Sequence, residues 1–146
     1  MGDQAGELGE AVAALHHALR RATVRATGRP ELPAAQSELL KLVERRPGIG
    51  VSAAAEQLGI APNTASTLVG EAVVAGLVTR ERDTGDRRTV RLLLTEEAHR
   101  RLERYRDLRR TLVAVGLGEL PPEARRELDA AVPHLRRLAE LLGGHG

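Results

Sequence analysis

The sequence predicts a mainly α-helical fold with one small β-hairpin, on three observations. Aromatic residues are almost absent, with Tyr105 as the single example, so the core must be built from Leu, Val and Ala, which favours helices. Apolar residues recur at intervals of three and four over most of the chain. The interval changes to two on either side of residues 83–88, which is the pattern of two strands joined by a turn.

The composition fits one domain and excludes several kinds of site. The 146 residues are enough to bury a core, and the absence of cysteine excludes disulfides, thiolate zinc sites and thiol redox switches. The pI near 9.9 overstates the basicity, since the formal net charge is only +2. Only one of the 22 basic residues is a lysine, so few groups titrate between the histidines and the arginines, and the pI is high although the net charge is small. A case for nucleic-acid binding therefore depends on where the arginines lie. Without an apolar N-terminal segment or a membrane-length apolar run, we expect a soluble cytoplasmic protein.

Two helices are expected before the first glycine-rich turn. The first covers residues 8–27 and is ended by Gly28 and Pro30; its apolar stripe is Leu8, Val12, Leu15, Leu19 and Ala22. The second covers residues 33–46, with Pro33 at its start. Its inward positions are Leu39, Leu40 and Val43, and Pro47, Gly48 and Gly50 close it.

Two short helices with a tight connection follow. Residues 52–58 form the first, with Ser52 expected as its N-cap and Gly59 as its end. The second has Pro62 at its first position and Gly76 at its C-terminal end. A connection of only three or four residues indicates a helix-turn-helix.

The segment "LVTRERDTGDRRTVRLLL" predicts a β-hairpin directly after this helix-turn-helix. Val78, Arg80 and Arg82 share one face of the first strand, and Val90 to Leu94 should anchor the second strand to the domain. Gly85 is free to adopt a positive φ at the tip. A helix-turn-helix followed by a β-hairpin is a winged helix.

Two further helices complete the chain. Thr95 is the expected N-cap of the first, with Glu96 and Glu97 in its first turn, and Gly116 and Gly118 are expected to break it. Its inner stripe is Ala98, Leu102, Tyr105, Leu108 (or Arg109) and Leu112. The last helix starts at Pro121 and Pro122, and Pro133 should kink it.

The sequence resembles the MarR family of winged helix-turn-helix transcriptional regulators. The resemblance is sharpest in "LPAAQSELLKLV" (32–43), in "AAEQLGIAPNTASTLVGEAVVAGLVTRERD" (54–83) and in "DTGDRRTVRLLLTEEAHR" (83–100). It implies a homodimer in which the first and last helices pack together, and a helix starting at Pro62 that lies in the DNA major groove. Within one domain of residues 1–146, it implies a DNA-binding core at 32–95 and dimerisation helices at 5–28 and 96–142. The implied interface residues are Leu8, Val12, Leu15, Leu128, Val132, Leu135, Leu138 and Leu142.

The hairpin tip resembles the family's wing motif, Asp-x-Arg-Asp-x-Arg. Asp83 and Asp86 match its acids and Arg88 its last arginine, which the resemblance implies is oriented by Asp86 and reaches into the minor groove. Gly85 stands where the family usually has the first arginine, and Arg82 and Arg87 are the candidates to compensate. The alternative is a solvated charged turn.

The helix after Pro62 contains short hydrogen-bonding residues and no Lys or Arg as far as Thr79. Asn can pair with adenine, and Thr can bond a base edge or touch a thymine methyl, so A·T contacts or water-mediated contacts are expected. The alternative is that Asn63 and Thr64 only support the helix start, since Ala61 is a poor N-cap. The predicted DNA-binding residues are Ser52, Pro62, Asn63, Thr64, Ser66, Thr67, Arg82, Asp86, Arg87 and Arg88.

A small aromatic or lipophilic effector is implied by the resemblance, with His16, Tyr105 and Arg109 as candidate contacts. No cofactor or metal is expected, because the scattered histidines form no zinc-ligand pair with a nearby carboxylate. Enzyme motifs are absent, and Asp83 and Asp86 lack a cleft that would shift their pKa values.

These observations predict a dimeric, sequence-specific DNA-binding regulator that acts as a repressor released by a ligand. Two alternatives stay open: a winged-helix protein-interaction module, favoured by the arginine-free helix, and a DNA-binding protein without an effector.

Overall fold

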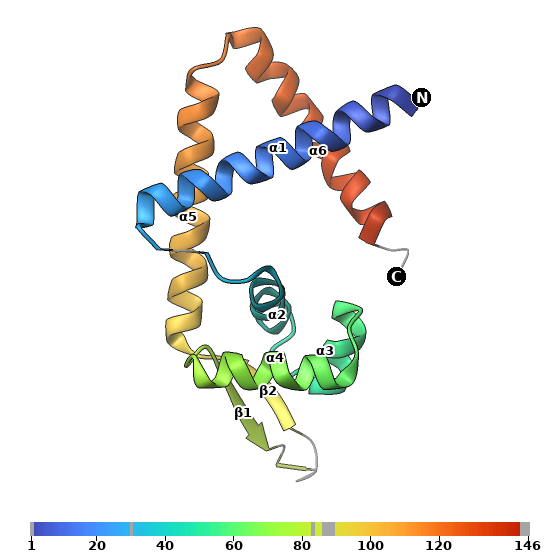
Figure 1. Ribbon diagram of the computed structural model, residues 1–146, viewed down its shortest axis with the longest axis vertical. Coiled ribbons are helices and arrows are strands. Elements are labelled where there is room, and N and C mark those ends of the chain that lie inside the picture. Colours follow the sequence, from blue (N-terminus) through green and yellow to red (C-terminus); the bar gives the residue numbers. More distant parts are fainter. Residues whose placement is uncertain (1, 30, 83, 86–89, 144–146) are drawn as a thin grey trace. The chain divides into compact units, whose positions relative to one another are not determined.

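The computed structural model describes residues 2–29, 31–82, 84–85 and 90–143 and confirms a mainly helical chain with one antiparallel hairpin (Figure 1). The elements in order are α1 (Gly2–Thr27), α2 (Ala34–Arg45), α3 (Val51–Leu58), α4 (Pro62–Val74), β1 (Val78–Arg82), β2 (Val90–Leu94), α5 (Glu96–Gly118) and α6 (Pro122–Gly143). The chain forms two compact units, one of Met1–Thr27 with Leu108–Gly146 and one of Gly28–Asp107. Helix α5 belongs to both units.

The unit of residues 28–107 holds the hydrophobic core. Helix α2 packs against α3, α4 and β2, and α4 packs against α3 and β1. The predicted inward residues Leu39, Leu40 and Val43 are buried. The other core residues are Leu42, Ile49, Ala54, Leu68, Val69, Ala72, Leu77, Val78, Leu92, Ala98 and Leu102. This aliphatic core holds α4 and the hairpin in one unit.

The helix-turn-helix is built by its predicted glycine and proline residues. Gly59 ends α3 with a φ of +63°, and Pro62 opens α4 at its first turn. Gly76 has a φ of +71° just after α4, and its N–H donates to the Val73 carbonyl at 3.0 Å. Left-handed backbone favours glycine because a Cβ is strained there, so these positions end their helices as predicted.

The prediction that Ser52 caps α3 is wrong. The helix begins at Val51, and the N-cap is Gly50 with an extended backbone (φ −80°, ψ 162°) and no side-chain hydrogen bond. Ser52 lies inside the first turn, where its hydroxyl is past the capping position.

The hairpin forms a two-stranded sheet, and a neighbouring segment is hydrogen-bonded to its second strand. Strands β1 and β2 pair in antiparallel register from Val78 opposite Leu94 to Arg82 opposite Val90. On the other edge of β2, the Gly48 N–H donates to the Leu92 carbonyl at 2.8 Å, and the Leu92 N–H donates to the Ile49 carbonyl at 2.9 Å. Segment 48–49 therefore pairs with β2 and ties the hairpin to the chain that leads into α3.

The ends of the long helices differ partly from the prediction. Helix α1 starts at Gly2 rather than Leu8, and α5 continues through Gly116 to Gly118. A glycine costs a helix about 1 kcal/mol, so the interior glycines Gly6, Gly9 and Gly116 weaken these helices without ending them.

The starts of the last two helices agree better with the sequence. The Thr95 Oγ1 accepts the Ala98 N–H at 3.2 Å and donates to the Gly76 carbonyl at 2.7 Å, so Thr95 caps α5 as predicted and links it to the end of α4. Helix α6 starts at Pro122 and runs on through Pro133. Among the described residues, no helix is long and apolar enough to cross a membrane.

Candidate nucleic-acid interface

Helix α4 has one face in the core and one face in solvent. Its buried residues are Ala65, Leu68, Val69 and Ala72, at helical spacing. The predicted residues Asn63, Thr64, Ser66 and Thr67 are all exposed. The Thr67 hydroxyl donates to the Asn63 carbonyl at 3.0 Å, which orients it and leaves its oxygen able to accept a further hydrogen bond. The helix thus presents short polar side chains to solvent.

The start of α4 is held by backbone geometry rather than by a polar side chain. The N-cap is Ala61, with an extended backbone and no side-chain hydrogen bond, and Pro62 follows in the first turn. The Ala65 N–H donates to the Ala61 carbonyl at 3.0 Å, which closes the first turn. Because no N-cap side chain covers this end, it stays open to a polar partner.

Glu71 is a residue of this surface that the sequence reading missed. It is exposed and lies four residues after Thr67, which itself lies four after Asn63, so all three share one side of α4. The same spacing could have identified it. Val74 follows on this side with 91% of its surface exposed.

The predicted wing residues are only partly described. Arg82 is exposed near the end of β1, and Ser52 is exposed in the first turn of α3. Asp83, Asp86, Arg87 and Arg88 lie outside the described residues.

The candidate effector residues are placed in different surroundings. His16 is exposed on α1, and its ring meets that of His17 edge-on with centroids 5.9 Å apart. The hydroxyl of Tyr105 donates to Glu31 Oε1 at 3.3 Å, in the unit of residues 28–107. Arg109 is half-buried on the part of α5 that belongs to the other unit.

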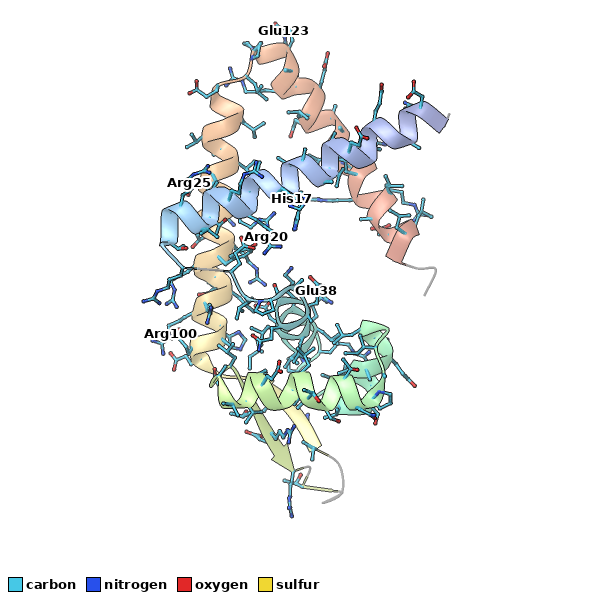
Figure 2. All side chains as sticks on the ribbon, in the orientation of Figure 1. His17, Arg20, Arg25, Glu38, Arg100 and Glu123 are labelled. Carbon is cyan, nitrogen blue, oxygen red and sulfur yellow. The ribbon has the colours of Figure 1, made fainter. Side chains whose placement is uncertain are left out.

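A cationic hollow lies along the C-terminal half of α1. It measures about 490 Å³ and is lined by His17, Arg20, Arg21, Val24 and Arg25; Figure 2 labels three of these side chains, His17, Arg20 and Arg25. His17, rather than His16, lines this hollow. No group of three candidate metal ligands occurs in the described part of the chain.

The predicted dimer residues form uncovered apolar stripes. On α1, Leu8, Val12 and Leu15 are exposed. On α6, the exposed stripe consists of Leu128, Val132, Leu135, Leu138, Leu141 and Leu142. Side chains of this size at helical spacing usually face a partner, because their exposure to water is unfavourable.

An ion pair joins α2 to α5 within the unit of residues 28–107. The Arg106 guanidinium donates to both carboxylate oxygens of Glu44, with one distance of 3.1 Å. These hydrogen bonds, with the positive charge of Arg106 and weaker contributions from His99 and Arg45, lower the pKa of Glu44 against the opposing effect of burial. The same bonds raise the pKa of Arg106.

Comparison with known proteins finds a family match over part of the chain and a set of solved structures with a similar fold. The MarR family model matches residues 31–89. No curated protein matches the chain. The RV1404 protein from Mycobacterium tuberculosis is 20% identical, with a TM-score of 0.80 over 99% of this chain and 95% of that one.

Two further solved structures carry ligands. The transcriptional repressor CouR, bound to a 23-mer DNA duplex, is 27% identical, with a TM-score of 0.65 over 95% of this chain and 96% of that one. S. aureus MepR bound to ethidium bromide is 16% identical, with a TM-score of 0.65 over 91% of this chain and 95% of that one. At 16–20% identity, RV1404 and MepR show a shared fold alone.

Proposed function

We propose that this chain is a transcription regulator that binds double-stranded DNA as a homodimer. Its residues 31–89 match the MarR family model, and its fold is that of MarR-family regulators. We propose no catalytic activity, because the family match and the solved structures of this fold point to transcription regulation. The observation that carries the proposal is the polar, exposed side of α4, the second helix of the helix-turn-helix. The DNA duplex bound by CouR, which shares the fold over nearly the whole chain, supports it.

The residues exposed on α4 favour readout in the major groove. Asn63 can pair with adenine through its amide, and Thr64, Ser66 and Thr67 can bond base edges or contact a thymine methyl. With no Lys or Arg on this helix to bind guanine, we propose A·T-rich half-sites. A symmetric dimer would place two such helices about 34 Å apart and read a pseudo-palindrome.

The wing would supply a second contact. Arg88, oriented by Asp86, would enter an A·T-rich minor groove, whose narrow shape attracts an inserted arginine. Gly85 stands where the family motif has its first arginine. Arg82 and Arg87 would compensate by contacting the DNA backbone in its place. Ser52 and Pro62 would lie next to the DNA at the starts of α3 and α4.

Dimerisation follows from the apolar stripes on α1 and α6. A second copy of the chain offers the same stripes, so a two-fold interface would remove these aliphatic side chains from water in both copies.

Control by a small molecule is the finer part of the proposal. The finer proposal is a repressor released by a small aromatic or lipophilic effector, with His16, Tyr105 and Arg109 as the candidate contacts. MepR bound to ethidium bromide supports this for a protein of the same fold. The hollow on α1 is a separate candidate surface, lined by His17, Val24 and three arginines. A DNA-binding protein without an effector is the competing form.

The test of DNA binding is a gel shift with fragments from upstream of the chain's own gene, from low to physiological salt. Retention of one fragment against excess unrelated DNA would support the proposal. If no fragment is retained at low salt, the rival hypothesis of a protein-interaction module gains, since α4 carries no cation to attract DNA.

A further inference from the structure

The hairpin carries its charges differently on its two faces. Residues directly opposite in an antiparallel pair share a face. Arg80 is opposite Leu92, and Arg82 is opposite Val90, so both arginines have apolar cross-strand partners. On the other face, Glu81 is opposite Arg91, which balances the charge there. The first face is therefore cationic and the second is neutral.

The cationic face is the one on which the helices pack. Val78 and Leu92 lie on it and are only 2% and 0% exposed, and α4 packs against β1. The strands extend beyond α4 (Figure 1), so Arg80 and Arg82 are exposed although they share a face with the core. They lie on the side of the hairpin that also carries α4.

The two arginines are available to an outside anion. In the part of the chain that the structure describes, no hydrogen bond or ion pair engages either guanidinium. Because Arg80 and Arg82 are two residues apart on one strand, their Cα atoms are roughly 6.6 Å apart. That separation is comparable to the distance between successive phosphates along one DNA strand.

Arg91 is placed differently and provides a matched control. Its guanidinium lies over Gly48, where an added Cβ would be 2.6 Å from Nη2 and 2.8 Å from Nε. Gly48 has a φ of +85°, a left-handed backbone that favours glycine. Arg91 thus packs back onto the edge segment 48–49, beside Glu81.

We propose that Arg80 and Arg82 form a phosphate-binding pair along β1, which holds one DNA strand between the groove read by α4 and the groove reached by the hairpin tip. This inference rests on the proposed DNA binding and assigns a new role to Arg80. The pair supplies cations that α4 lacks, and it binds DNA of any sequence because phosphates carry no base information.

The test compares Arg80→Met, Arg82→Met and the double variant with Arg91→Met, in salt titrations of DNA binding by fluorescence anisotropy. Methionine keeps much of the aliphatic stem, so packing against the strand is retained while the charge is lost. Each lost phosphate contact lowers the slope of log K against log salt by about 0.9. A dimer carries each substitution twice, so the slope should fall by about 1.8 for each single variant and by about 3.6 for the double variant. Binding to operator and to unrelated DNA should weaken alike, while Arg91→Met keeps the wild-type slope.

Each outcome has a separate meaning. If the wild-type protein binds DNA and Arg80→Met keeps its salt slope, the phosphate-binding pair is wrong while the proposed function stands. If Arg91→Met lowers the slope as much as Arg80→Met, the assignment of the cationic face is wrong. If the wild-type protein binds no DNA, the proposed function itself fails. Thermal unfolding of each variant checks the fold, and Arg80→Lys, which keeps the charge, should retain the slope.

Discussion

The guanidinium of Arg106 on α5 donates hydrogen bonds to both carboxylate oxygens of Glu44 on α2, although the two residues are 62 positions apart in the sequence. The preceding residue, Tyr105, donates to Glu31, 74 residues away. Two successive residues thus fasten α5 to the segment around α2, just before Asp107, the last residue of the unit of residues 28–107. Both contacts lie within this unit and hold the first part of α5 to it.

Replacing Glu44 by Gln should destabilise the protein in a pH-dependent way. The pair is partly exposed, so at pH 7 we expect a loss of about 1 kcal/mol. Because the folded state lowers the pKa of Glu44 below its ordinary value of 4.5, this stability is present above pH 4.5 and is lost as the pH falls through the lowered pKa. Urea unfolding of both proteins at several pH values measures the difference, which should vanish in acid; a constant difference would contradict the assignment.

Replacing Arg88 by Ala should weaken operator binding and reduce its salt dependence. In the proposed complex Arg88 enters the minor groove, so the substitution would take away a cation at a site of enhanced negative potential. Gel shifts across a salt titration measure both effects. Unchanged affinity at every salt concentration would eliminate the wing as a DNA contact.

Replacing Glu71 by Gln should strengthen binding to DNA of any sequence. Its carboxylate is exposed on the same side of α4 as Asn63 and Thr67 and would repel nearby phosphates. We expect a gain on the order of threefold at low salt, which shrinks as salt screens the charge. The matched control is Glu140→Gln on α6, where the carboxylate pairs with Arg137 at 3.0 Å and no change in DNA affinity is expected. A weaker complex for Glu71→Gln would instead indicate that Glu71 accepts a hydrogen bond from a base.

Replacing Leu135 by Glu should dissociate the dimer. Leu135 lies in the exposed stripe of α6, and a charge buried in an aliphatic interface has no partner to offset its desolvation. Sedimentation velocity should give a dimer for the wild-type chain and a monomer for the variant. Val74→Ser, an exposed apolar change on α4, should remain dimeric. A dimeric Leu135→Glu would place the interface elsewhere.

An effector should raise the melting temperature of the protein, since a ligand that binds only the folded state stabilises it by about 2.7 kcal/mol at a hundred times its Kd. Differential scanning fluorimetry with small aromatic anions and cations checks this, and Arg25→Gln should reduce the shift for the anions if they occupy the hollow on α1. If no compound shifts the wild-type melting temperature or releases DNA, the effector-free form is favoured.

Local signals in the sequence predicted most elements, because the forces that start and stop a helix act within a few residues. Gly59, Pro62, Gly76 and Thr95 stand where backbone conformation or capping demands them. The same local signals gave wrong predictions where a single residue changes the stability of a helix only slightly. Gly116 does not end α5, and the N-cap of α3 is Gly50 rather than Ser52.

By itself, the sequence determined the mainly helical fold, the helix-turn-helix followed by a hairpin, the polar face of α4 and the apolar stripes of α1 and α6. These features depend on periodicity and on local glycine, proline and capping signals. Only the tertiary structure decided which distant residues meet. Segment 48–49 is too short to show a strand period, yet it pairs with β2. Glu44 and Arg106 are ordinary surface charges in the sequence, and β-strand register alone sets Arg91 opposite Glu81 and leaves Arg80 and Arg82 opposite apolar residues. The pairing of Glu44 with Arg106 and of segment 48–49 with β2 depends on the packing of whole elements, whereas the hairpin register depends on the length and type of the turn.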